Sequence, residues 1–123
     1  MQNRNVYTVT EITTRIKAFL EADPGLQNVF VRGEISNYKL HSSGHHYLTL
    51  KDEGATLNGA MFRYDALKLR FRPENGMKVI AFGRIGVFPK NGQYQLYIED
   101  MQPDGIGALF TAFEQLKEKL RLE

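Results

Sequence analysis

The segment Arg32–Asp52 reads RGEISNYKLHSSGHHYLTLKD. Alternating apolar positions on either side of a central Ser-Ser-Gly predict two strands joined by a loop. The segment concentrates cations, rings and short polar side chains, the groups that grip single-stranded nucleic acid, so we expect a binding face. Its candidate binding residues are Arg32, Asn37, Tyr38, Lys39, His41, Ser43, His45, Tyr47 and Lys51.

The charge of the chain is distributed unevenly around this segment. The net charge is +2, but residues 28–95 hold ten Lys and Arg against five Asp and Glu, a sum of +5. Residues 1–27 are balanced at three against three, and residues 96–123 sum to −3. The positive charge therefore coincides with the hairpin, which favours a polyanionic partner there.

Length and composition indicate one globular domain. The chain has 123 residues, of which 42% are apolar and 24% charged. The sequence has no apolar run of the length that a membrane span needs and no signal segment, so we expect a cytoplasmic protein. The absence of cysteine excludes disulfides, thiolate zinc sites and cysteine nucleophiles.

A helix is predicted before the hairpin, and its start carries a clear signal. Thr8 and Glu11 have the spacing of a capping box. Apolar residues then recur at helical spacing as far as Leu20, and Asp23-Pro24-Gly25 is expected to end the helix.

From residue 28 onward the apolar period changes to two. Strands are expected near residues 28–37, 46–51, 56–63, 77–88 and 93–101, with Tyr38–His46 as a loop. Residues 64–72 are expected to form a short helix or an irregular connector. Asn91-Gly92 is a strong hairpin signal between the last two strands.

Five strands with one connector between the third and fourth predict a mainly β fold with flanking helices, namely the OB-fold, a five-stranded Greek-key barrel. An open five-stranded sheet is the alternative, but it would leave two bare edges. The expected organisation is an N-terminal helical extension at residues 1–27, the barrel at 28–103, and the start of a helix at 104–123.

In OB-folds the ligand lies across the second and third strands, between the loops that join strands one and two and strands four and five. This mapping adds candidates outside the first hairpin, since these elements also carry aromatic and basic side chains. The added residues are Phe62, Arg63, Arg84, Phe88, Lys90, Tyr94 and Gln95. The alternative for each ring is packing inside the barrel.

Metal binding and catalysis find little support in the sequence. His41, His45 and His46 are close together, but the last two are neighbours in a predicted strand and point to opposite faces. The acidic pairs Asp52-Glu53 and Glu99-Asp100 do not converge on one ion. We predict no metal, cofactor or catalytic residue in this segment.

The last predicted helix, Ile106–Leu122, has one apolar face and no stop signal, so we expect a longer parent chain. Together with this helix, several ordered motifs are specific. They are RGEISN at 32–37, SGH at 43–45, LKD at 50–52, MFR at 61–63 and GIGAL at 105–109. In these motifs the chain resembles the amino-terminal domain of the exodeoxyribonuclease VII large-subunit family.

The resemblance implies a domain that binds single-stranded DNA, followed by a catalytic region beyond Glu123 and a helical region that engages the small subunit. It also implies an enzyme that degrades single-stranded DNA from either end into oligonucleotides and contributes to DNA repair. The alternative is an OB-fold module for protein interaction or self-association, because one small barrel cannot obviously bury two apolar helix faces. An RNA ligand is a third reading.

Overall fold

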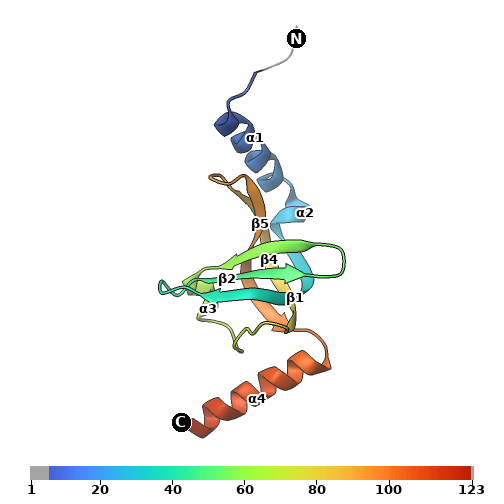
Figure 1. Ribbon diagram of the computed structural model, residues 1–123, viewed down its shortest axis with the longest axis vertical. Helices are drawn as coiled ribbons and strands as arrows, with labels where there is room; N and C mark the ends of the chain where they lie inside the picture. The colour runs from blue at the N-terminus through green and yellow to red at the C-terminus, as the bar shows by residue number, and fades with distance from the viewer. Residues whose placement is uncertain (1–5, 123) are drawn as a thin grey trace.

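The computed structural model describes residues 6–122, in which five strands close into a barrel with the order β1-β2-β3-β5-β4 (Figure 1). The strands are β1 (Val29–Leu40), β2 (His46–Lys51), β3 (Thr56–Met61), β4 (Lys78–Phe88) and β5 (Gln93–Pro103). Neighbouring strands are antiparallel except β3 and β5, which pair in parallel where Gly59 lies opposite Leu96. The predicted five-stranded barrel is confirmed, and the open sheet is excluded.

The alternation of apolar and polar residues along each strand explains which side chains form the core. Side chains alternate between the inside and the outside of each strand, so every second residue points into the barrel. The largest fully buried side chains are Ile35, Met61, Val79, Leu96 and Ile98. The outer face is therefore left to the residues between them, and it is on this face that the candidate site is built.

A β-bulge in β1 changes which residues reach the outer face. Ser36 pairs with Thr49 and Lys39 with Tyr47, so β1 holds one residue more than β2 across this stretch. Asn37 takes up the extra residue with a φ of 51°. The predicted loop at 38–46 is accordingly shorter, because β1 continues to Leu40 and only residues 41–45 lie outside strands.

Gly83 marks a second irregularity, in the pairing of β4 with β5. The register shifts between Phe82 and Gly83. A Cβ atom at Gly83 would overlap the carbonyl oxygen of Tyr97, so only glycine allows the two backbones to approach this closely.

Two helices precede the barrel. In α1 (Val9–Glu21) the predicted capping box is present, with Thr8 Oγ1 accepting from Glu11 N at 3.0 Å. Asp23 does not simply end the helical region, because its side chain caps a second short helix, α2 (Pro24–Gln27). Gln27 Nε2 then donates to the carbonyl oxygen of Ile85 at 3.1 Å, which ties α2 to β4.

Two further helices follow the third and fifth strands. The third strand is shorter than predicted, since it ends at Met61 and α3 (Arg63–Ala66) begins two residues later. α4 (Ile106–Leu122) is attached by Gln115, which accepts from Arg72 N at 2.6 Å and donates to Arg72 O and to Glu74 Oε2, each at 2.7 Å.

α1 and α4 extend from opposite ends of the barrel (Figure 1), and both leave much of their apolar faces uncovered. Phe19 of α1 is 78% exposed and Phe113 of α4 is 58% exposed. The expectation that the barrel does not bury both helix faces is thus confirmed. Across residues 6–122, no helix has the length and hydropathy required to cross a membrane.

Candidate nucleic-acid interface

A row of outward side chains crosses the barrel from β2 to β4. Tyr47 pairs with Ala60, Ala60 with Tyr97, and Tyr97 with Arg84, so these four residues lie side by side on four consecutive strands. Their neighbours along each strand, such as Leu48 and Leu96, are buried in the core. The alternation of the strands therefore presents two tyrosines and an arginine together at the outer surface.

Tyr97 is the centre of this row. The ring of Phe62 lies 5.8 Å from it, centroid to centroid, at an interplanar angle of 32°. On β4, the guanidinium carbon of Arg84 lies 4.8 Å from the centroid of the Tyr97 ring. The ring of His45 meets the ring of Phe62 edge-on, with 5.3 Å between their centroids. We call Tyr47, His45, Phe62, Tyr97 and Arg84 the aromatic row. Such a set offers successive π-faces and a cation to stacked bases.

Small residues lie between the large ones. Ala60 separates Tyr47 from Tyr97, and Gly86 lies beneath the Tyr97 ring. A Cβ atom at Gly86 would come within 2.6 Å of Tyr97 Cε2, so the ring rests directly on the backbone of β4. Ala60 and Gly86 are both buried, so the large side chains of the row pack closely over these small residues.

The loop at 41–45 borders the row and is held in place by its own hydrogen bonds. His41 Nδ1 and Ser43 Oγ are 2.9 Å apart, and the His41 ring meets Tyr47 edge-on at 6.3 Å. Lys39 pairs with Tyr47 across the two strands and is exposed. The structure thus brings Lys39, His41 and Ser43 to the edge of the aromatic row, as the sequence predicted for this hairpin.

His45 joins the loop to α3. Its Nδ1 accepts a hydrogen bond from Arg63 N at 2.9 Å, which places the ring proton of the neutral tautomer on Nε2. Gly44, with a φ of +91°, lies against the Arg63 side chain, and a Cβ atom there would be 2.9 Å from Arg63 Cγ. The loop and the start of α3 therefore form one surface.

Polar side chains of β2, β3 and β5 continue the outer face beyond the aromatic row. Thr49 Oγ1 donates to Asn58 Oδ1 at 3.4 Å, and Asn58 Nδ2 donates to Gln93 Oε1 at 3.2 Å. A groove between β3 and the β4–β5 hairpin is lined by Thr56, Leu57, Asn58, Gly92, Gln93 and Tyr94. Of the exposed candidates of this hairpin, Tyr94 lines the groove, Phe88 pairs with the groove residue Gln93, and Lys90 lies in the turn between the two strands. The half-buried Gln95 follows Tyr94 on β5.

Two predicted cations lie elsewhere. Arg32 Nε is 2.8 Å from Asp104 Oδ2 near the start of α4, and Lys51 Nζ is 3.5 Å from Glu34 Oε2. Both are already paired with carboxylates at the opposite end of the strands from the aromatic row. Their placement differs from the single cationic surface that the hairpin sequence predicts.

Tyr38 also lies apart from the row. Because the bulge at Asn37 reverses the alternation, Tyr38 packs against the core and Lys39 takes the outward position. The hydroxyl of Tyr38 is 2.8 Å from His46 Nδ1, and its backbone N donates to Asn75 Oδ1 at 2.8 Å. This ring is half-buried, in the position that the packing alternative describes.

Burial sets the ionisation of this inner pair. It raises the pKa of Tyr38, an effect that the Arg72 charge partly opposes, and it lowers the pKa of His46. Both side chains are therefore held neutral near pH 7. The hydrogen bond between them is a neutral contact on the inner side of β1 and β2, whereas the aromatic row lies on the outer face.

Tyr97, the centre of the row, was missed by reasoning from the sequence. The signal was present: Leu96 and Ile98 both point inward, so the residue between them points outward. What the sequence does not give is the pairing partner, since the contact with Phe62 depends on the parallel alignment of β3 with β5.

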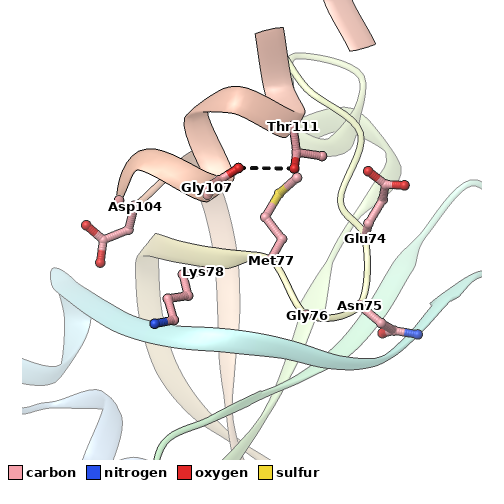
Figure 2. A pocket seen from close by; sticks show the side chains of 10 residues that line it. Glu74, Asn75, Gly76, Met77, Lys78, Asp104, Gly107 and Thr111 are labelled. Carbon is pink, nitrogen blue, oxygen red and sulfur yellow. Dashed lines mark hydrogen bonds between the residues drawn. The ribbon is translucent and has the colours of Figure 1, made fainter. Parts of the chain in front are cut away.

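A separate hollow lies at the other end of the barrel, between the turn at 74–78 and the start of α4 (Figure 2). Its walls carry Met77, Lys78 and Asp104, and Thr111 Oγ1 donates to the carbonyl of Gly107 at 3.1 Å. No aromatic ring lines it. Lys78 is six residues along β4 from Arg84, or about 20 Å, so this hollow is not part of the aromatic row.

The three histidines use their Nδ1 atoms in three different contacts, to Ser43, to the Arg63 backbone and to Tyr38. Within the described residues 6–122, no three His, Cys, Asp or Glu side chains gather as metal ligands would. The chemistry that this surface offers is stacking, hydrogen bonding and charge.

The comparisons with known proteins point to the same class of domain. The profile described as "OB-fold nucleic acid binding domain" matches residues 7–102. That range includes the whole barrel except the last residue of β5, and thus every member of the aromatic row.

Curated relatives confirm the resemblance to exodeoxyribonuclease VII large subunits. The chain is 57% identical over 118 residues to the exodeoxyribonuclease 7 large subunit of Ruminiclostridium cellulolyticum, covering 96% of this chain and 29% of that protein. It is 55% identical to the corresponding protein of Halalkalibacterium halodurans, covering 96% of this chain and 26% of that one. The chain therefore spans between a quarter and a third of the length of these relatives.

Solved structures show the same fold at low sequence identity. A replication protein A heterotrimer bound to ssDNA contains a chain with a TM-score of 0.53 and 14% identity, covering 78% of this chain and 74% of that one. The S. pombe Stn1-ten1 complex gives a TM-score of 0.52 and 19% identity, with coverage of 78% and 73%.

Proposed function

Because the chain belongs to the family of OB-fold nucleic-acid-binding domains, we propose that it binds single-stranded DNA across the outer face of β2, β3 and β5. The observation that carries the proposal is the aromatic row centred on Tyr97, with Phe62 at 5.8 Å and Arg84 at 4.8 Å. Each stacked base contributes about 1–3 kcal/mol.

In this mechanism the rings hold bases and the surrounding cations hold phosphates. Tyr47, Phe62 and Tyr97 stack, while Lys39 and Arg84 contact the backbone of the strand. Arg63 at the start of α3 and Lys90 on the β4–β5 hairpin extend the phosphate contacts to both sides. Stacking and charge read π-faces and backbone rather than base edges, so sequence preference is slight.

We further propose that the chain is the DNA-binding part of an exodeoxyribonuclease VII large subunit. The identity of 55–57% to such subunits supports this. The whole protein would hydrolyse phosphodiester bonds of single-stranded DNA from either end, together with its small subunit, in the cytoplasm and in the service of DNA repair. The catalytic region would follow residue 123, and this barrel would supply strand to it.

The binding proposal is tested by fluorescence anisotropy with a labelled single-stranded oligonucleotide and this 123-residue chain. We expect saturable binding that weakens with salt, with a slope of about −0.7 in log K against log [salt] for each phosphate held. Competition with RNA of the same sequence measures the preference for DNA. Absence of binding at low salt would contradict the proposal.

A second candidate function is self-association, which the exposed apolar faces of α1 and α4 favour. Contiguous apolar surface on a small protein often marks an interface. Size-exclusion chromatography with light scattering distinguishes the two functions. A stable dimer that no longer binds DNA would favour the second candidate, whereas a monomer that binds DNA would favour the first.

A further inference from the structure

Resting on the proposed binding of single-stranded DNA, we infer a second contact surface that extends from the aromatic row, over α3 and the connector at 67–72, to α4. It takes the sugar-phosphate backbone of the same strand after it leaves Phe62. We call this surface the connector track and define it by Arg63, Tyr64, Lys68, Arg70, Arg72 and Lys119.

The track begins at Tyr64, two residues after Phe62. The Tyr64 side chain is 74% exposed, although large aromatic side chains are usually well covered. The Lys68 ammonium nitrogen lies 4.0 Å from the centroid of its ring and 4.0 Å from Asp65 Oδ1, so this cation covers one face of the ring and is shared with a carboxylate. This arrangement places a stacking ring and a phosphate-binding group side by side, just past the end of the aromatic row.

The connector after α3 continues the positive charge. Residues 63–72 hold four cations and one carboxylate, and Arg63, Arg70 and Arg72 are all exposed. Within the part of the chain that the structure describes, no ion pair involves any of these three arginines. They differ in this from Arg32 and Lys51, which are paired with carboxylates, and they remain available to phosphate.

The track ends in a groove between the connector and α4. Its lining includes Arg70, Arg72 and Lys119, with Glu118 as the one carboxylate. The groove is held open in a fixed shape, because Gln115 makes two hydrogen bonds to the backbone of Arg72. A net positive groove between two rigidly connected walls matches a polyanion better than it matches an apolar partner.

Negative charge borders the track on one side. A neighbouring hollow is lined by Asp65, Glu99 and Asp100, together with the track residues Lys68 and Arg70. These carboxylates repel a phosphate backbone and so restrict the strand to the side that faces α4. In Figure 1 the connector runs from α3 towards α4, so the track leads the strand away from the barrel along one edge.

The test compares two lengths of oligothymidylate, of about 5 and about 15 nucleotides, on the 123-residue chain and the double variant Arg70→Gln/Arg72→Gln. The shorter probe fills the aromatic row alone, and the longer one also reaches the track. Loss of two phosphate contacts reduces the salt slope by about 1.4 and weakens the 15-nucleotide probe about 25-fold at 0.1 M salt. Binding of the 5-nucleotide probe stays unchanged.

The matched control is Arg15→Gln/Lys17→Gln, which removes the same charge from α1 at the other end of the barrel. We expect both probes to bind this control as they bind the unmodified chain. The conservative pair Arg70→Lys/Arg72→Lys keeps the charge and should restore most of the lost affinity, and thermal melting verifies that every variant is folded.

The outcomes separate this inference from the proposed function. If the unmodified chain binds both probes and the double variant binds the longer one equally well, the track is wrong and the aromatic row stands. If Arg70→Gln/Arg72→Gln and the control Arg15→Gln/Lys17→Gln weaken binding of the longer probe equally, the total charge of the chain accounts for the effect and the track is again wrong. If the unmodified chain binds neither probe, the proposed function fails and the track fails with it.

Discussion

The outer surface of β2, β3 and β5 and the end of the barrel next to α4 contain similar side chains in different surroundings. In the first region Arg84 lies over the Tyr97 ring, and among residues 6–122 it forms no ion pair. In the second region Arg32 is paired with Asp104, and Lys51 with Glu34. A count of cations along the sequence treats Arg84, Arg32 and Lys51 as equal, whereas their partners leave Arg84 available to an anionic ligand and occupy the other two.

The largest effect is expected from a substitution that distorts the barrel and so damages both regions. Gly83→Ala places a methyl group against the carbonyl oxygen of Tyr97, where backbone cannot move aside. We expect a loss of about 3 kcal/mol in the free energy of unfolding, measured by chemical denaturation. Gly107→Ala is the control, because a Cβ atom there meets nothing within 4 Å. A Gly83→Ala protein as stable as the control would contradict the close approach of β4 and β5.

Removing the central ring should affect the first region only. Tyr97→Ala removes one stacking platform, so we expect single-stranded DNA to bind about 5- to 150-fold more weakly, from about 1–3 kcal/mol per stacked base. Tyr97→Phe keeps the π-face and should bind nearly as well as the unmodified chain. Tyr7→Ala, on the segment before α1, is the matched control, and an equal loss in that variant would show that the row has no special role.

Two arginine substitutions compare the regions directly. Arg84→Gln removes a cation from the aromatic row, and we expect about fivefold weaker binding at 0.1 M salt with a salt slope smaller by about 0.7. Arg32→Gln breaks an exposed pair with Asp104, so it should change DNA affinity by less than about twofold. Anisotropy titrations at several salt concentrations measure both. Equal losses in the two variants would remove the distinction between the regions.

The smallest expected effect concerns the inner pair of Tyr38 and His46. Burial lowers the pKa of His46, so between that value and the ordinary value of 6.5 the unfolded chain binds more protons than the folded one. Stability should therefore be complete above pH 6.5 and decrease as the pH falls below it. His46→Leu should remove this part of the pH dependence, and Tyr38→Phe should retain it because burial is its main cause. Thermal melts from pH 5 to 8 measure the difference.

Local signals in the sequence were sufficient where one segment determines its own structure. The capping box of Thr8 and Glu11 forms as predicted. Asn91-Gly92 joins β4 to β5, with a φ of 67° at Gly92 and the Asn91 side chain accepting from Gln93 N. The five-stranded barrel followed from the spacing of such signals, because each strand and turn is specified over a few residues.

Features that depend on two distant segments could not be predicted in this way. The bulge at Asn37 decides whether Tyr38 or Lys39 faces outward, and the backbone N of Tyr38 donates to Asn75 Oδ1, 37 positions along the chain. The pairing of Arg32 with Asp104 likewise joins residues 72 positions apart. These two contacts place Tyr38 and Arg32 away from the aromatic row.

The Gln115 hydrogen bonds have a mechanical consequence. α4 has 17 residues, so it is a rod of about 25 Å. Ala108 near its start packs in the core, and Gln115 joins its middle to the connector at Arg72. The seven residues of α4 after Gln115 extend about 10 Å, so a change of about 10° at that attachment would displace the far end of the helix by about 2 Å. Gln115 bonds the same backbone that carries Arg72. Any shift of that backbone is therefore passed on to α4, so the direction of this helix is coupled to the position of the connector.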